Sequence, residues 1–149
     1  MKHFPIKLCF FIITCFVFLS CKKMEKATPP NILTIIKDSL QVQESYSKVL
    51  VVQKRGCSLC NQKFNEYIKE NLEDRNTLII FSGANMIEFL KNVDTTAVNI
   101  IYDRKQLFYK TNTLNTSAAV LMNKNEIDTI LNLSDARVFN RNLEYLSER

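Results

Sequence analysis

The sequence predicts an α/β domain in which a central mixed sheet is flanked by helices, as a three-layer sandwich. Between residues 48 and 102, β-branched apolar runs alternate with segments of helical spacing. Parallel strands need crossover helices, so this alternation places helices on the faces of a sheet. Two further apolar runs flank a polar turn at residues 123–126, which predicts an antiparallel hairpin. The length of 149 residues, with two glycines and three prolines, suits one compact domain rather than a fibrous chain.

The strands are predicted from short runs rich in valine, isoleucine and leucine. The first such run, at residues 48–53, is broken by Lys54-Arg55-Gly56. The second ends at Ser82-Gly83. The predicted strands lie at residues 48–53, 77–81, 98–102, 118–122 and 127–131.

The helices are predicted from apolar side chains that recur three or four residues apart. The spacing predicts helices over residues 57–72 and 85–93, and an amphipathic connection over 105–113. Ser134 is expected to N-cap a last helix. Residues 32–40 suit a first helix, although the alternation just after them could equally belong to a strand.

The first twenty residues have the pattern of a signal peptide. A short basic head precedes an apolar run of about a dozen residues, which is shorter than the ~20 needed for a permanent membrane span. The run ends in Phe18-Leu19-Ser20-Cys21. A small residue directly before a cysteine, with leucine before it, resembles the lipobox of bacterial lipoprotein signal peptides.

This resemblance implies that residues 1–20 are removed and that Cys21 receives a diacylglycerol and an N-terminal acyl chain such as palmitate. Residues 21–31 would then be a lipidated tether, and residues 32–149 the folded domain. Two or more acyl chains give stable anchoring, so we expect a protein held to a membrane by lipid and facing the periplasm or the cell surface. The alternative is an ordinary signal peptide or an uncleaved anchor in which Cys21 is incidental.

Composition narrows the partners and the chemistry. The formal net charge of +5 includes two lysines of the signal segment, and no basic run is interleaved with aromatic residues. We therefore expect no nucleic acid partner. The only histidine, His3, lies in the signal segment, which excludes histidine-dependent chemistry in the mature domain.

The five cysteines have different expected fates, and only two of them are expected to remain as unmodified cysteines in the mature domain. Cleavage removes Cys9 and Cys15, and lipidation consumes Cys21, so Cys57 and Cys60 are left as one pair. Outside the cytoplasm a disulfide between them can persist. Zinc usually takes four nitrogen or sulfur ligands, and haem attachment needs a histidine after the second cysteine, so we expect neither a metal nor a cofactor.

The pair is expected where a strand passes into a helix. Cysteines three apart on the first helical turn have Cα atoms within the ~4.4–6.8 Å that a disulfide needs. Cys57, at the helix start and after Lys54 and Arg55, has a favoured thiolate, which is the nucleophile. Cys60 should be shielded on the apolar face. We therefore expect Cys57 to attack a partner disulfide and Cys60 to resolve the mixed disulfide. The alternative is a purely structural disulfide, although so small a loop constrains the unfolded chain little.

From about residue 48 to the end, the chain resembles the thioredoxin-like fold, and most closely the membrane-tethered extracytoplasmic thiol-disulfide oxidoreductases. The order strand–CxxC–helix carries the resemblance, together with Ile101-Tyr102-Asp103 and the segment at residues 116–127. It implies Cys57 as nucleophile, Cys60 as resolving thiol, and Thr116-Ser117 in the loop that faces the disulfide and pairs with substrate backbone. The implied partners are exported proteins with thiols or disulfides and a membrane electron donor.

The chain departs from that family at three positions. The family has a cis-proline at the place of Ser117, and because a cis bond without proline costs ~2.5–4 kcal/mol, we expect the Thr116–Ser117 bond to be trans. Gly56 stands where the family often has an aromatic residue, and Val51 where many members keep a buried acid. These departures favour a second hypothesis, a non-catalytic binding or accessory lipoprotein with a static Cys57–Cys60 disulfide.

Overall fold

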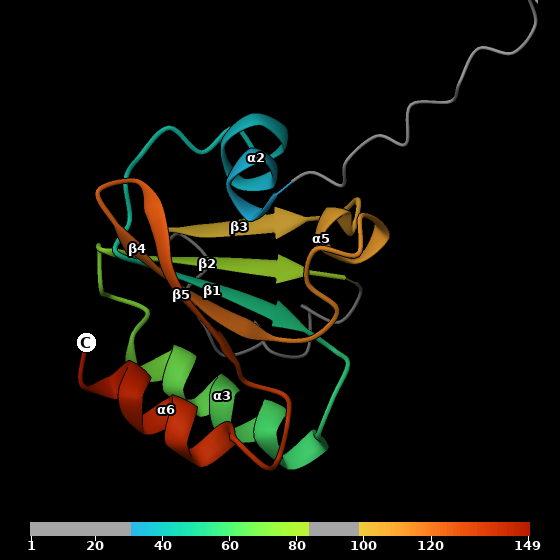
Figure 1. The fold of residues 1–149 in the computed structure, drawn as a ribbon, viewed down its shortest axis with the longest axis vertical. Helices are drawn as coiled ribbons and strands as arrows, with labels where there is room; N and C mark the ends of the chain where they lie inside the picture. Colours follow the sequence, from blue (N-terminus) through green and yellow to red (C-terminus); the bar gives the residue numbers. More distant parts are fainter. Residues whose placement is uncertain (1–30, 84–98) are drawn as a thin grey trace, which may run out of the picture.

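The computed structural model describes residues 31–83 and 99–149 and confirms the predicted α/β sandwich (Figure 1). Five strands form one mixed sheet in the order β3-β2-β1-β4-β5. The strands β1, β2 and β3 run parallel, whereas β4 is antiparallel to β1 and β5 antiparallel to β4. Their bounds are Lys48–Gln53 (β1), Thr77–Ser82 (β2), Ile100–Asp103 (β3), Ala118–Asn123 (β4) and Glu126–Asn132 (β5).

Helices form the two outer layers of the sandwich (Figure 1). One layer consists of α3, Ser58–Glu70, and α6, Phe139–Ser147. The other contains α2, Ile32–Thr34, its continuation η1, Ile35–Ser39, and the short α5, Leu107–Lys110. None of the helices in the described part of the chain has the length and apolar character needed to cross a membrane.

Alternating side chains of the central strand β1 supply both halves of the core. Leu50 packs with Phe64 of α3 in one buried cluster, whereas Val49 and Val51 pack with Ile35 in the other. Successive side chains of a strand point to opposite faces, so a run of consecutive apolar residues is required where both faces are covered. This is why β1 reads as a continuous apolar run in the sequence.

Several predicted elements differ in detail from the structure. The strand expected at 98–102 is β3 at Ile100–Asp103, and the predicted connection at 105–113 contains α5. The ambiguous segment after Asn31 is helical as far as Ser39. The predictions for the signal segment 1–20, for Cys21, for tether residues 22–30 and for a helix at 85–93 lie outside the described residues.

The prediction that Ser134 caps the last helix is wrong. The helix α6 begins at Phe139, its N-cap is Val138, and no side chain caps it. The Ser134 hydroxyl instead accepts a hydrogen bond from the backbone N–H of Ser117 and is therefore committed to another part of the fold.

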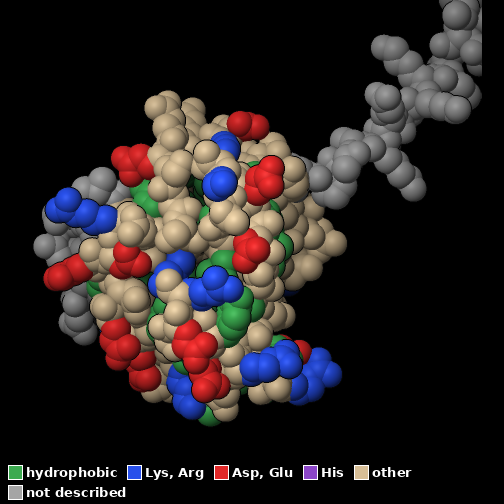
Figure 2. All heavy atoms as spheres, turned by 60° about the vertical axis from the view of Figure 1, so that its left-hand side comes forward, with side chains coloured by type: hydrophobic (Ala, Val, Ile, Leu, Met, Phe, Trp, Pro, Cys, Tyr) green, Lys and Arg blue, Asp and Glu red, His purple; other side chains and the backbone are tan. Residues whose placement is uncertain are grey.

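Acidic and basic side chains are interspersed on the face drawn in Figure 2. Neither sign gathers there into one continuous patch. This face therefore offers no extended single-sign field that would attract a polyanion or a polycation.

Candidate functional site

The two cysteines are joined by a disulfide at the junction of β1 and α3. Their Cα atoms are 5.1 Å apart, within the range that a disulfide bridges without backbone movement. Cys57 is the N-cap residue of α3, and its Sγ accepts the backbone N–H of Cys60 at 3.2 Å. The structure thus brings together the pair that the sequence predicts, and it places one sulfur at the amino end of a thirteen-residue helix.

The two sulfurs differ in their surroundings. Cys60 is only 4% exposed and belongs to the core cluster with Phe64, whereas Cys57 is partly buried at the edge of that cluster. Leu59, between them, is 61% exposed. A partner molecule approaching from solvent therefore meets Cys57 and Leu59 before Cys60.

Gly56 holds the loop before the disulfide against the β5–α6 loop. Its φ is +112°, a value that favours glycine. A Cβ on Gly56 would overlap the Cβ of Ser134 and lie 2.9 Å from its Oγ. The backbone N–H of Cys57 donates to the Ser134 carbonyl oxygen at 3.1 Å. Glycine at position 56 thus permits a close approach that fixes the backbone of Cys57.

Ser134 is the centre of a small hydrogen-bond network beside the disulfide. Its Oγ accepts from the Ser117 N–H at 3.1 Å and bonds to Asn61 Oδ1 at 3.3 Å. The Nδ2 of Asn61 in turn donates to the Lys54 carbonyl at 3.3 Å. Sequence reasoning missed both Ser134 and Asn61, because their partners lie on other elements.

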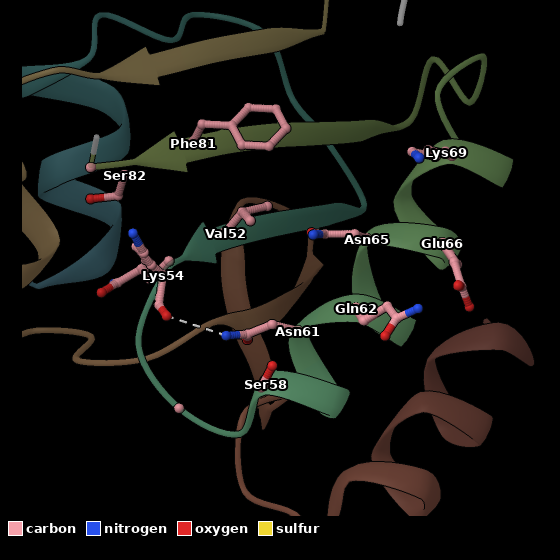
Figure 3. A pocket seen from close by; sticks show the side chains of 13 residues that line it. Val52, Lys54, Ser58, Asn61, Gln62, Asn65, Glu66, Lys69, Phe81 and Ser82 are labelled. Atoms are coloured by element: carbon pink, nitrogen blue, oxygen red, sulfur yellow. Dashed lines mark hydrogen bonds between the residues drawn. The ribbon is translucent and has the colours of Figure 1, made fainter. Parts of the chain in front are cut away.

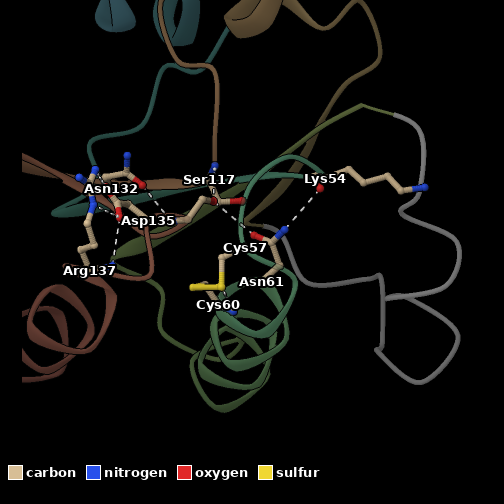
Figure 4. The surroundings of a disulfide bond; sticks show 9 residues. Lys54, Cys57, Cys60, Asn61, Ser117, Asn132, Asp135 and Arg137 are labelled. Atoms are coloured by element: carbon tan, nitrogen blue, oxygen red, sulfur yellow. Dashed lines mark hydrogen bonds and ion pairs between the residues drawn. A yellow bond between two sulfur atoms is a disulfide. The ribbon is translucent and has the colours of Figure 1, made fainter.

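Ser117 lies in the surroundings of the disulfide, as the resemblance implies (Figure 4). It is fully buried, and no peptide bond within residues 31–83 and 99–149 is cis, so the Thr116–Ser117 bond is trans as predicted. Its hydroxyl accepts the Gln53 N–H and donates to the Gln53 carbonyl, both at 2.9 Å. The Ser117 side chain is therefore used inside the domain, and Thr116 is the half-buried neighbour nearer to solvent.

Positive side chains precede the disulfide. Lys54 and Arg55 are exposed, and the Arg55 guanidinium carbon lies 4.0 Å from the centroid of the Tyr109 ring, an arrangement of the cation–π type. The acid labelled in Figure 4 is Asp135, whose carboxylate pairs with Arg137 at 2.7 Å. Hydrogen bonds from the Arg137 side chain and backbone lower the pKa of Asp135 to about 2. Because Lys54 and Arg55 are positive and the charge of Asp135 is paired with that of Arg137, the site favours an anion near Cys57.

A groove of about 620 Å³ runs beside the disulfide along one face of α3 (Figure 3). Amide side chains of Asn61, Gln62 and Asn65 line its helix wall, and Val52 and Phe81 line its sheet wall. A bound polypeptide could hydrogen-bond to the amide side chains and pack against the apolar ones. In the described part of the chain no three His, Cys, Asp or Glu side chains are grouped as a metal site would need.

Asp103 is a buried acid to which sequence reasoning assigned no role of its own. It is 1% exposed at the end of β3, and its Oδ2 accepts from the Ser82 hydroxyl at 2.7 Å. Among the residues that the structure describes, its Oδ1 has no hydrogen-bond partner. Two strands separate Asp103 from β4, so it lies away from the Ser117 side of the sheet.

Comparisons with family models, with curated proteins and with solved structures found no match to this chain. The fold of this chain is therefore inferred from its own structure. It has an α/β sandwich with a five-stranded mixed sheet, and a CxxC-spaced disulfide where the central strand passes into a helix, which is compatible with a thioredoxin-like fold.

Proposed function

We propose that this protein is a thiol-disulfide oxidoreductase, anchored by lipid on Cys21 outside the cytoplasm, that exchanges disulfides with exported proteins. The observation that carries the proposal is the asymmetry of the Cys57–Cys60 pair. One sulfur caps a helix and is partly accessible, and the other is buried one turn further on. A purely structural bridge requires no such difference between its two sulfurs.

The proposed reaction starts from the reduced pair. The Cys57 thiolate is stabilised by the unpaired N–H groups at the start of α3, of which that of Cys60 already points at its sulfur. It attacks one sulfur of a partner disulfide, the partner's S–S bond breaks, and the other partner sulfur leaves as a thiolate. Cys57 is now joined to the partner by a mixed disulfide.

Cys60 completes the exchange. Its thiol loses a proton and attacks Cys57 Sγ, and the second partner sulfur leaves and takes up a proton. The first partner thiolate takes up the proton that Cys57 released on forming its thiolate, so the partner has gained two electrons and two protons. Cys57–Cys60 has become the disulfide seen in the structure. A membrane electron donor would reduce the pair again, and the same steps run in reverse would oxidise a partner dithiol.

A second candidate is a binding or accessory lipoprotein in which the disulfide stays closed. Two observations favour it. The side chain of Ser117 is fully engaged with Gln53, and Val51 is buried in the α2 side of the core where an acid could have assisted proton transfer. Both candidates share the anchor and the fold and differ only in whether Cys57 exchanges.

Trapping distinguishes the two candidates. In a Cys60→Ser variant the mixed disulfide on Cys57 cannot be resolved, so adducts with exported proteins should accumulate and disappear on reduction. The matched control is Cys57→Ser, which keeps one cysteine of the pair but removes the accessible one and should form none. A folded Cys60→Ser protein that forms no adduct would establish the accessory candidate instead.

The anchor is tested separately. Labelled palmitate should be incorporated into the wild-type chain and not into a Cys21→Ala variant. Incorporation that survives this substitution would contradict lipidation at Cys21.

A further inference from the structure

The loops around the disulfide all lie at one edge of the sheet. The strands β1, β2 and β3 run parallel, so their carboxyl ends meet at this edge, where α5 also lies (Figure 1). Because β4 is antiparallel to both β1 and β5, β4 begins and β5 ends at the same edge. We call the surface formed by residues 54–58, 103–117 and 133–138 the disulfide edge.

Charge is unevenly distributed between the disulfide edge and the rest of the domain. The edge contains six cations and two acids, whereas the other described residues contain eight cations and ten acids. The sequence of residues 84–98 adds only one lysine and two acids. The domain is therefore almost neutral as a whole but positive where the disulfide lies. The exposed cations of the edge are Lys54, Arg55, Arg104, Lys105, Lys110 and Arg137.

The two acids of the disulfide edge offset little of this charge. Asp103 is 1% exposed and accepts a hydrogen bond from the Ser82 hydroxyl inside the domain. Asp135 pairs with Arg137. A positive field therefore extends from this edge into solvent, and it attracts negatively charged molecules to the disulfide.

Arg55 is held in place at the disulfide edge by an aromatic ring. The carbon of its guanidinium lies 4.0 Å from the centroid of Tyr109 in α5. Within residues 31–83 and 99–149, no carboxylate forms an ion pair with Arg55. Stacking uses one face of the planar guanidinium and leaves N–H groups along its edge, which match the two oxygens of a carboxylate. Because Arg55 lies two residues ahead of Cys57, a carboxylate bound there would belong to a group close to the exchanging sulfur.

We propose that the disulfide edge selects partner proteins whose reacting cysteine is flanked by aspartate or glutamate, and that Arg55 receives one of these carboxylates. This inference rests on the proposed function, because disulfide exchange brings the partner to this edge. An anionic lipid surface is another polyanion near an anchored protein, but it would cover the disulfide and block exchange. An acidic polypeptide instead brings its own sulfur to Cys57.

The test uses the full-length protein, purified in detergent and reduced, with three peptide disulfides of equal length. The residues that flank the cysteine are glutamates in the first peptide, glutamines in the second and lysines in the third. Each kcat/KM is divided by the rate constant for the same peptide with mercaptoethanol, which removes differences in intrinsic reactivity. At low ionic strength, the normalised kcat/KM should be about tenfold higher for the glutamate peptide than for the lysine peptide. This preference should fall to about twofold at ~0.5 M salt.

Two variants test the role of Arg55. In Arg55→Gln the preference for the glutamate peptide should fall about threefold, as expected for the loss of one exposed ion pair. The matched control is Lys124→Gln, which removes the same charge from the exposed β4–β5 turn at the opposite edge of the sheet and should leave the preference unchanged. An equal fall in both variants would overturn the role of Arg55, because the net charge of the protein would then account for the preference.

The peptide assay also separates this inference from the proposed function. A reduced protein that reacts with none of the three peptides would refute the proposed function. Equal normalised kcat/KM for all three at low ionic strength would overturn the inference and leave the exchange activity standing.

Vesicles test the lipid alternative. Vesicles of phosphatidylcholine, with or without added phosphatidylglycerol, should leave the reaction with a small neutral disulfide unchanged. Slowing by the phosphatidylglycerol vesicles alone would overturn the inference, because the disulfide edge would then face the membrane.

Discussion

Substitution of Gly56 by alanine should destabilise the fold around the disulfide. Gly83 provides a matched control against which the loss of unfolding free energy can be measured. Gly56 and Gly83 both have φ of +112°, so an alanine at either position carries the same kind of backbone strain, about 1–2 kcal/mol. The change in unfolded-chain entropy is also shared. At Gly83 a new Cβ meets no atom of residues 31–83 or 99–149 within 4 Å.

At Gly56 the new Cβ meets Ser134. It would overlap Ser134 Cβ and approach its Oγ to 2.9 Å and its carbonyl oxygen to 3.1 Å, so a backbone segment must move. Overpacking of this kind costs about 1–3 kcal/mol. Gly56→Ala should therefore lower the free energy of unfolding by about 1–3 kcal/mol more than Gly83→Ala does. The same displacement would break the bond from the Cys57 N–H to Ser134.

Urea unfolding of both variants measures the difference in free energy. A double variant, Gly56→Ala with Ser134→Gly, removes the obstructing Cβ and should recover part of the loss, which appears as a coupling energy in a double-mutant cycle. Equal losses for Gly56→Ala and Gly83→Ala, within about 0.5 kcal/mol, would refute the close approach to Ser134 as the reason for glycine at this position.

Substitutions at three further positions test buried or hydrogen-bonded polar groups. The pKa of Asp74 is lowered from 3.8, first by the hydrogen bond from Thr77. The stabilisation that Asp74 provides is therefore present above pH 3.8 and is lost as the pH falls through the lowered value. Asp74→Asn should flatten the acid limb of a plot of unfolding free energy against pH, and an unchanged limb would contradict this. Asp103→Asn places an amide where an oxygen has no partner among the described residues, and it keeps an acceptor for Ser82, so it should be neutral or stabilising. Asp103→Ala should cost about 1–3 kcal/mol in urea unfolding. Equal losses for the two variants would sink this reasoning. The side chain of Asn99 donates to three carbonyl oxygens at 2.8–3.4 Å. Asn99→Ala should therefore lower the free energy of unfolding in urea by about 2–3 kcal/mol. A loss below about 0.5 kcal/mol would show that these hydrogen bonds do not stabilise the fold.

The sheet could be predicted from the sequence because its strands carry their own signal. Residues 48–53 read as a buried strand, and β1 has those bounds. The strand expected at 77–81 extends by one residue to Ser82. Where both faces of a strand are covered, every position must be apolar or buried, and that requirement is visible without knowledge of the fold. The edge strand β3 is shorter and less buried, and its predicted start falls outside the described residues.

The pairing of the cysteines could also be predicted, because it depends on one helical turn. The contacts of Ser134 could not. A serine four residues ahead of an apolar stripe satisfies the local rule for a helix cap, and nothing local reveals that its oxygen atoms are taken by Cys57 and Ser117. Ser117 itself was predicted near the disulfide only through the family resemblance. Its bonds to Gln53 follow from strand register, which the sequence does not fix.

The contact between the Cys57 amide and the Ser134 carbonyl joins the start of α3 to the β5–α6 loop. A polypeptide that emerges from its N-terminus presents both thiols long before that carbonyl follows. Until then the nascent chain carries two accessible thiols beside an incomplete sheet, and these thiols can form disulfides with other nearby sulfur atoms. The backbone of Cys57 therefore reaches its final conformation late, once Ser134 has followed and the β5–α6 loop packs against the start of α3.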